Sequence, residues 1–402
     1  MKKTINILML ILLVVAISMS ICTQKLFAQK AVKNAELQTD LLLKEISKAD
    51  NKNGTLVSPR TIEKGELKLV ASKDWTSGFF PGELWYLFEL TKNKKWQEEA
   101  IKFTSFIEKE KLNGTTHDMG FKVYCSFGNA YRLTGNKADK EVIIQAAKTL
   151  ATRFNPKVGA LRSWDHHAEQ WKFPVIIDNM LNLELLFEAT KLTGDSTYYH
   201  IAVKHANTTL KNHFRPDFST WHVVSYDPET GLVEKKNTHQ GYNDDSVWAR
   251  GQAWALYGYT LCYRETKDLK YLEQAQNIAN FLFINKNMPK DLVPFWDFNA
   301  PEIPNEPKDV SAAMVISSAL FELSTYSKNQ KDYLNKANQI LSNVSEKYTS
   351  ALGANKGFIL DHSTGSKPQN SEVNVPINYA DYYYLEALVR ANRLKNKQAV
   401  VQ

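Results

Sequence analysis

The sequence contains few of the residues that define several protein classes. Its 402 residues include only 3 Cys, 13 Pro and 17 Gly. So few cysteines exclude a fold built on a disulfide framework, and so little glycine and proline excludes a collagen-like or low-complexity chain. Apart from the N-terminus, no apolar run is long enough to cross a bilayer, which excludes a protein with several membrane spans.

Several functional signatures are also missing. The formal net charge is +7, but no run of five or more basic residues occurs, so nothing favours a nucleic-acid-binding protein. The chain has no paired His or Cys/His spacing of a metal site, no Gly-rich phosphate loop and no Gly-x-Ser-x-Gly motif. We therefore expect no metal, no cofactor and no nucleic-acid partner.

Residues 1–28 have the pattern of a secretory signal peptide. Two lysines precede an apolar run over 5–21, and Ala28 is a small residue suited to cleavage. Cleavage there removes three lysines and no acid, so the net charge falls from +7 to +4. We expect one catalytic domain over 29–402, periplasmic or secreted, and no longer attached to the membrane. A lipid-carrying Cys22 is an alternative, although the bulky residue before it disfavours a lipoprotein; an uncleaved membrane anchor is another.

What the sequence does contain is a repeat. An apolar helix, a short polar turn and an amphipathic helix recur along the chain, as at 187–195 and 263–268. The amphipathic helices are expected near 32–49, 94–110, 138–153, 196–213, 269–283 and 331–347. The apolar helices are expected near 77–91, 119–134, 175–193, 247–266, 310–327 and 378–394. Apolar helices belong inside and amphipathic ones outside, so six pairs predict an all-α (α/α)6 barrel, a toroid of six helical hairpins. An open solenoid is the alternative.

The loops of this predicted barrel are asymmetric. The segments that lead from an outer to an inner helix are long, and they hold most of the Trp, His and Asp residues that no helix needs. Long loops that carry function gather on one face. The active face is therefore expected at the N-terminal ends of the inner helices, where free N–H groups favour an anionic ligand.

Two aspartates stand at the beginning of inner helices. Asp178 lies in the apolar run Pro-Val-Ile-Ile-Asp-Asn-Met-Leu, and Asp118 follows His117. Burial raises the pKa of a carboxyl group, so Asp178 is a candidate general acid; a buried aspartate held by a neighbouring donor is the alternative. For Asp118 the alternative is an ordinary helix N-cap. Two acids at adjacent helix starts suit glycoside hydrolysis, which commonly uses a carboxyl pair.

Candidate ligand-binding residues occur at the start of the fourth inner helix. Arg250 and Trp254 are one turn apart and share a face. Arginine binds carboxylates in a fork, and tryptophan stacks on sugar rings. The alternative for Arg250 is a bridge between helices, to Asp244 or Asp245, and for each Trp it is core packing.

Six ordered motifs resemble the unsaturated glucuronyl hydrolases of glycoside hydrolase family 88. They are Trp-Thr-x-Gly-Phe-x-Pro-Gly at 75–82, His-Asp-x-Gly-Phe at 117–121, Asp178 in its apolar run, Thr-His-Gln-Gly-Tyr at 238–242, Trp-Ala-Arg-Gly-Gln-Ala-Trp at 248–254 and Tyr-Ala-Asp-Tyr-Tyr-Tyr-Leu-Glu-Ala-Leu at 379–388. The resemblance covers nearly all of the mature chain, and the (α/α)6 barrel of that family agrees with the helix pattern.

The resemblance implies an enzyme that removes a Δ4,5-unsaturated glucuronic acid from the non-reducing end of lyase-generated oligosaccharides. In that family's reaction Asp178 would protonate C4 and help water to add at C5, after which the hemiketal opens and the sugar leaves as a keto acid. Asp118 would be the second required acid. The residues implied around the unsaturated uronate are His222, Gln240, Arg250 and Trp254, with Trp75 and Trp164 as stacking walls.

The segment 361–367 resembles the region where family members contact the neighbouring sugar, in some of them through its sulfate. Ser363, Ser366 and Lys367 would suit a sulfate; a solvated turn is the alternative. Family members act on fragments of glycosaminoglycan, ulvan or gellan, and we expect glycosaminoglycan disaccharides. An unsaturated rhamnogalacturonyl hydrolase is the nearest rival, followed by a sugar epimerase and a non-enzymatic carbohydrate-binding protein. The sequence leaves open whether the protein is a monomer or a homodimer.

Overall fold

Two concentric rings of helices make up the part of the chain that the computed structural model describes, residues 29–402. The predicted signal peptide and Cys22 lie outside it. The inner ring consists of α2 (Phe79–Thr91), the π-helix η2 (Gly120–Gly128) continued by α4 (Asn129–Thr134), α6 (Asn179–Thr193), α8 (Ala249–Thr266), α10 (Val310–Leu323) and α12 (Asn378–Lys395). The outer ring consists of a helix over 29–48, α3 (Lys94–Ser105), α5 (Lys137–Ala151), α7 (Ser196–Asn212), α9 (Leu269–Ile284) and α11 (Gln330–Lys347).

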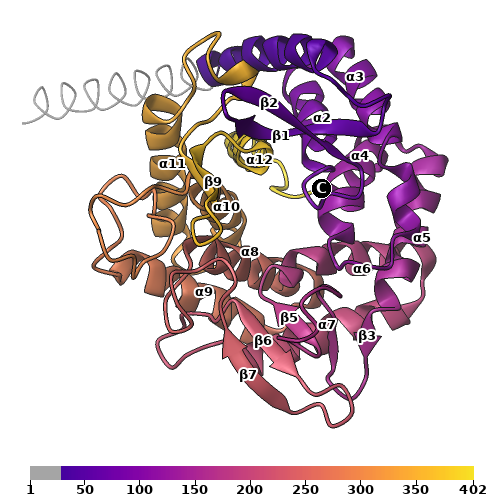
Figure 1. The fold of residues 1–402 in the computed structure, drawn as a ribbon, viewed down its shortest axis with the longest axis vertical. Helices are drawn as coiled ribbons and strands as arrows, with labels where there is room; N and C mark the ends of the chain where they lie inside the picture. The colour runs from indigo at the N-terminus through magenta and orange to yellow at the C-terminus, as the bar shows by residue number, and fades with distance from the viewer. Residues whose placement is uncertain (1–28) are drawn as a thin grey trace, which may run out of the picture.

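The inner ring closes on itself. Each inner helix packs against the next one along the chain, and the last, α12, packs against the first, α2. Figure 1 shows the chain passing once around the ring. This closure confirms the predicted (α/α)6 toroid and excludes an open solenoid, whose ends would not meet.

A two-residue turn explains the repeat seen in the sequence. Four inner helices end in a left-handed residue, and the next residue is an Asn or Asp whose side chain accepts the backbone N–H of the following outer helix. The pairs are Lys92-Asn93, Gly135-Asn136, Gly194-Asp195 and Lys267-Asp268. The left-handed residue stops one helix and the Asn or Asp caps the next, which fixes each tight antiparallel hairpin.

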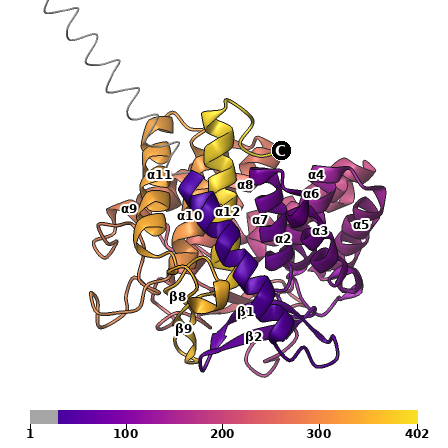
Figure 2. The ribbon, with the colours of Figure 1, turned by 90° about the horizontal axis from the view of Figure 1, so that it is seen from above.

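The long loops contain short β-strands, which the all-α prediction did not include. They form the hairpin β1 (Leu56–Glu63) with β2 (Glu66–Ala71), the short pair β3 (Phe154–Asn155) with β4 (Ala160–Leu161), the sheet of β5 (Pro174–Ile176), β6 (Val223–Tyr226) and β7 (Val233–Asn237), and the hairpin β8 (Ser363–Ser366) with β9 (Ser371–Val375). In Figure 2 the hairpins β1–β2 and β8–β9 lie at one end of the barrel, and the C-terminus lies at the other.

One predicted helix boundary was wrong, and the type of another helix was not foreseen, each for a physical reason. The third inner helix was expected from residue 175, but Pro174–Ile176 pairs as a strand with β6, and α6 starts only at Asn179. Proline has no N–H to donate, so it fits the strand end as well as a first helical turn. The second inner helix is a π-helix over Gly120–Gly128, a form that sequence periodicity does not reveal. None of the helices in residues 29–402 combines the length and the apolar character that a bilayer span requires.

Candidate active site

Asp178 lies where strand β5 turns into helix α6. Its side chain makes no cap hydrogen bond to the helix, and it is only 9% exposed. One carboxyl oxygen, Oδ2, has no hydrogen-bond partner within residues 29–402. Burial raises its pKa to about 7, although the nearby His117 and Arg250 oppose the shift. A carboxyl group of this kind keeps its proton near neutral pH, as the sequence predicted for a general acid.

His222 faces this carboxyl group in a defined tautomer. It immediately precedes β6, which pairs with β5, and its Nε2 lies 3.7 Å from Oδ2 of Asp178. Its Nδ1 accepts the backbone N–H groups of His239 and Gln240, at 3.1 and 3.2 Å. Burial holds the pKa of His222 well below its usual value, so the ring is neutral. Because Nδ1 is an acceptor, Nε2 carries the proton and points it towards Asp178.

Asp118 is in the opposite ionisation state. Its carboxylate accepts the Thr116 hydroxyl at 2.5 Å and lies 3.2 Å from Nε2 of His117. Burial alone would raise the pKa of Asp118, but His117, the Thr116 hydroxyl and Lys122 together hold it below its ordinary value. The side chain caps no helix, so the N-cap alternative was wrong. Asp118 adds a small upward push to the pKa of Asp178, which shows that the two acids share one electrostatic environment.

Arg250 is more constrained than the sequence suggested. It is 1% exposed, and its Nη1 donates to Oδ2 of Asp309 at 2.6 Å. Nη1 and Nη2 also donate to the backbone carbonyls of Thr364 and Gly365, each at 2.6 Å. Arg250 therefore pairs with neither Asp244 nor Asp245. Its two terminal nitrogens already donate to protein acceptors, so they do not form a free bidentate site for a ligand carboxylate. Only Nε has no partner within residues 29–402.

Gln240 donates to the same backbone carbonyl of strand β8 as Arg250 does, that of Gly365. Its side-chain Nε2 donates to the carbonyl of Gly365 at 3.0 Å, while its backbone N–H donates to His222. Gln240 thus connects the hairpin β8–β9 to the imidazole that faces Asp178. Its amide oxygen remains available to a ligand.

Aromatic rings form the walls around these groups. Trp75 packs against Tyr379, with ring centroids 5.1 Å apart. Trp254 is fully buried under Phe121, and its indole Nε1 has no partner among the described residues. Trp164 is 9% exposed and is stacked on His166 at 5.1 Å with nearly parallel rings. One face of Trp164 is therefore already covered by its own loop.

The three residues expected to contact the neighbouring sugar all lie on or beside β8. Ser363 is buried and Ser366 is half-buried, and neither hydroxyl has a partner in the described part of the chain. The Lys367 ammonium lies 3.7 Å from Glu306 and above the ring of Trp296. Within residues 29–402 the serine hydroxyls are therefore unpaired, whereas the lysine is already paired.

Sequence reasoning missed Asp309. It immediately precedes α10, and the pairing of its Oδ2 with Arg250 depends on a contact between two helices. Residues 29–402 hold no group of three or more His, Cys, Asp or Glu side chains arranged to bind a metal ion.

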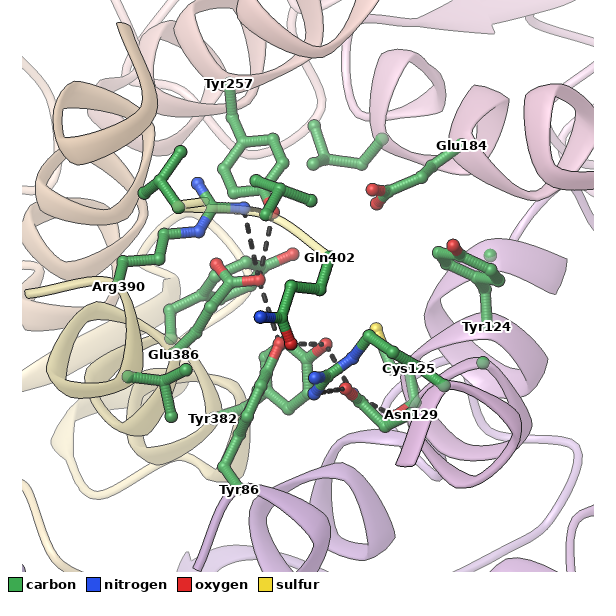
Figure 3. A pocket seen from close by; sticks show the side chains of 18 of the residues that line it. Tyr86, Tyr124, Cys125, Asn129, Glu184, Tyr257, Tyr382, Glu386, Arg390 and Gln402 are labelled. Carbon is green, nitrogen blue, oxygen red and sulfur yellow. Dashed lines mark hydrogen bonds and ion pairs between the residues drawn. The ribbon is translucent and has the colours of Figure 1, made fainter. Parts of the chain in front are cut away.

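A polar hollow lies at the other end of the barrel, towards the C-terminal ends of the inner helices (Figure 3). The hydroxyls of Tyr86 and Tyr257 donate to Glu386, and Arg390 donates to Tyr257. The C-terminal residue Gln402 points into the hollow. The charged groups here are linked to one another, unlike Asp178.

Comparisons with known proteins agree with this geometry. A sequence model of the family described as Glycosyl Hydrolase Family 88 matches residues 46–282. An unsaturated glucuronyl hydrolase of Formosa agariphila is 54% identical over 340 residues, which is 84% of each chain. The chain belongs to glycosyl hydrolase family 88.

Further members of the family extend the likeness. An unsaturated chondroitin disaccharide hydrolase of Streptococcus pneumoniae is 33% identical and covers 80% of this chain and 83% of its own. The crystal structure of an unsaturated glucuronyl hydrolase specific for heparin superposes with a TM-score of 0.88 at 45% identity, over 93% of this chain and 99% of that one. Family 88 membership makes the protein a glycosidase, as the sequence motifs predicted.

Proposed function

We propose that this family 88 enzyme removes the Δ4,5-unsaturated glucuronic acid from the non-reducing end of lyase-generated oligosaccharides. The observation that carries the proposal is the contrast between its two acids. Burial raises the pKa of Asp178 to about 7, while the partners of Asp118 hold its pKa below the ordinary value. At weakly acidic pH one group is a proton donor and the other a carboxylate, which is how paired carboxyl groups divide acid and charge-stabilising roles.

The chemistry follows from this division. Asp178 donates its proton to C4 of the vinyl ether, and positive charge develops at C5 and the ring oxygen. The Asp118 carboxylate stabilises this charge. Asp178, now a carboxylate, accepts a proton from the water that adds to C5, so its proton is restored. The resulting hemiketal opens, the glycosidic oxygen leaves with the neighbouring sugar, and the uronate becomes a keto acid.

The ligand-binding assignments rest on position. His222 presents a proton from Nε2 beside Asp178, and the unpartnered Nε of Arg250 and Nε1 of Trp254 are further donors. We propose that these groups and the amide of Gln240 bind the unsaturated uronate, with Trp75 and Trp164 beside it. Glycosaminoglycan disaccharides are the substrates we favour, because two of the named relatives are described as a chondroitin disaccharide hydrolase and as specific for heparin.

Ultraviolet absorbance tests the proposal directly. The conjugated double bond of the unsaturated uronate absorbs, and its hydration removes the absorbance. Mature protein should bleach unsaturated chondroitin or heparin disaccharides. Bleaching of pectin fragments alone would favour a rhamnogalacturonyl hydrolase, and bleaching of ulvan or gellan fragments alone would move the substrate to those polysaccharides. No bleaching of any of them by folded protein would reject the reaction.

The location of the enzyme is a separate proposal. The basic start and apolar run of residues 1–28 support export and cleavage after Ala28. N-terminal sequencing of the protein from the periplasm or medium should then begin at Gln29. A lipid-modified Cys22 at the N-terminus, found by mass spectrometry of the membrane fraction, would contradict this.

A further inference from the structure

The start of helix α10 holds a buried aspartate with two distinct tasks. Asp309 is fully buried, and its Oδ1 accepts the backbone N–H groups of Ser311 and Ala312, at 3.1 and 3.3 Å. The hydroxyl of Ser311 also donates to Oδ1, at 2.5 Å. The other oxygen, Oδ2, accepts Nη1 of Arg250 at 2.6 Å. One oxygen therefore caps the helix, and the other orients a buried guanidinium.

The oriented guanidinium holds strand β8. Arg250 donates to the carbonyls of Thr364 and Gly365. The same stretch is joined to the start of α10 by the Thr364 hydroxyl, which donates to the Lys308 carbonyl at 2.8 Å, and by the N–H of Val310, which donates to the His362 carbonyl at 3.3 Å. Hydrogen bonds from the starts of helices α8 and α10 thus hold strand β8 of the hairpin next to the Arg250–Asp309 ion pair.

The hairpin is in turn part of the active site. Gln240 bonds both the Gly365 carbonyl and His222, whose Nε2 faces Asp178. The hydroxyls of Ser363 and Ser366, on the same strand, have no partner in residues 29–402. A shift of β8 would move these donors and the Gln240 amide relative to the reacting carboxyl group.

Because both charges are buried, the position of strand β8 depends on the ion pair between Arg250 and Asp309. Arg250 is 1% exposed and Asp309 is fully buried, so neither charge is solvated by bulk water. If one partner is removed, the other is left as an uncompensated buried charge and the surrounding groups rearrange. The backbone carbonyls of β8 would then be the only described acceptors of the two terminal nitrogens of Arg250.

We propose that Asp309 is a positioning residue for substrate binding: it fixes the direction of the Arg250 guanidinium and through it the place of strand β8, which Gln240 links to His222. This inference rests on the proposed function, because its effect is measured on the unsaturated oligosaccharide. Asp309 does not touch the reacting atoms; it decides where the hairpin presents its donors.

Asp309→Asn separates the two tasks. Asparagine caps helices as well as aspartate does, so the start of α10 is kept while the ion pair with Arg250 is lost. The KM for an unsaturated disaccharide should rise roughly tenfold or more, with kcat at weakly acidic pH changed by less than about threefold. This split indicates lost binding without lost chemistry.

A pH profile provides a readout that a purely structural role would not move. The charged or titratable groups that act on Asp178 are His117, His222, Arg250 and Asp118. Asp309→Asn leaves the charge of Arg250 uncompensated, which favours the carboxylate of Asp178 and lowers its pKa. The alkaline limb of the kcat profile should therefore move to lower pH.

Two matched variants complete the test. Ser311→Ala weakens the cap but keeps the ion pair, and Asp268→Asn makes the same substitution at the exposed cap of α9. Both should keep the wild-type KM and pH profile.

The outcomes distinguish the two proposals. The positioning role would be overturned if Asp309→Asn left the KM and the alkaline limb of the pH profile unchanged. It would also be overturned if Ser311→Ala raised the KM as much as Asp309→Asn does. In both cases bleaching by the wild-type protein would still support the proposed reaction. Absence of bleaching by the wild type would instead reject the reaction. If Asp309→Asn does not fold, Asp309→Ser, which also caps a helix, carries the same expected results.

Discussion

Two buried acids, one at each end of the barrel, have very different partners. At the end of the barrel where the C-terminus lies, Glu322 accepts two hydrogen bonds from Arg264 and lies 3.3 Å from Arg390. At the end of the long loops, Asp178 has an oxygen with no partner among the described residues and a neutral imidazole in front of it. The carboxylate of Glu322 joins arginines from two other inner helices and so holds those helices together. A buried acid without such a partner is free to exchange its proton.

Burial alone does not identify the catalytic acid. Asp381, in the first turn of α12, also has a pKa raised by burial, to about 8. Both of its oxygens, however, accept backbone N–H groups, from Ile359 and Leu360, at 2.8 Å each. Asp381 ties a loop to the inner ring, whereas one buried oxygen of Asp178 has no hydrogen-bond partner within residues 29–402. The hydrogen-bond partners, and not the raised pKa, separate the two.

The largest expected effect is on the unpaired acid. Asp178→Asn should lower turnover by roughly a thousandfold, the scale of general acid–base catalysis, and largely spare substrate binding. Ultraviolet bleaching gives the rate, and the thermal midpoint should stay near the wild-type value because the side chain makes no cap bond. Asp381→Asn is the matched control, with reduced stability and near-native kcat. Near-native turnover of Asp178→Asn would refute the general-acid role.

The paired acid should show the reverse pattern. Glu322→Gln leaves two buried arginines without their carboxylate, so the free energy of unfolding should fall by about 3–5 kcal/mol. Urea denaturation measures this loss. The folded fraction should keep kcat within about twofold, because Glu322 lies at the other end of the barrel. A large loss of kcat with unchanged stability would erase the distinction between the two ends.

The pH dependence of activity sharpens the contrast between Asp178 and Asp118. Asp178 must be protonated, so kcat/KM should fall about tenfold per pH unit above its pKa of about 7. Asp118 must be ionised, and its pKa lies below the ordinary 3.8, so activity should persist down to about pH 4. Initial rates across this range test both limbs. An acid limb centred above pH 5 would mean that Asp118 is not held as a carboxylate.

The smallest effect concerns a paired charge at the active end. Lys367 lies beside Glu306 and is partly exposed. Lys367→Ser should raise the KM for a sulfated disaccharide by less than about threefold and leave the unsulfated one unchanged, since the Lys367 ammonium is already paired with Glu306 and partly solvated. Ser366→Ala serves as the comparison for an unpaired donor. A tenfold rise for the sulfated substrate would show that Lys367 exchanges Glu306 for the sulfate.

The sequence predicted more of the fold than of the site's contacts. The alternation of apolar and amphipathic helices predicted an inner and an outer set, because a helix with two buried faces has to lie inside one with a single buried face. The closure of the ring was decided by the packing of α12 against α2. The sequence missed the strand at Pro174–Ile176, because a short apolar run fits a strand or a helix equally well. For Arg250 it offered a carboxylate-binding fork or a bridge between helices to Asp244 or Asp245; the bridge is present but its partner is Asp309, because the spacing within α8 says nothing about the next inner helix.

By itself the sequence determined the six helical hairpins, the family motifs and the two aspartates, all of which depend on local periodicity and on residues close together in the chain. The tertiary structure alone decided the protonation states and the partners. Asp178 is an acid because β5, β6 and α6 bury it beside a neutral His222, and Asp118 is a carboxylate because His117 and Thr116 reach it. Whether a charge is buried, and what lies within hydrogen-bonding distance of it, depends on segments that are distant in sequence, and only folding brings them together.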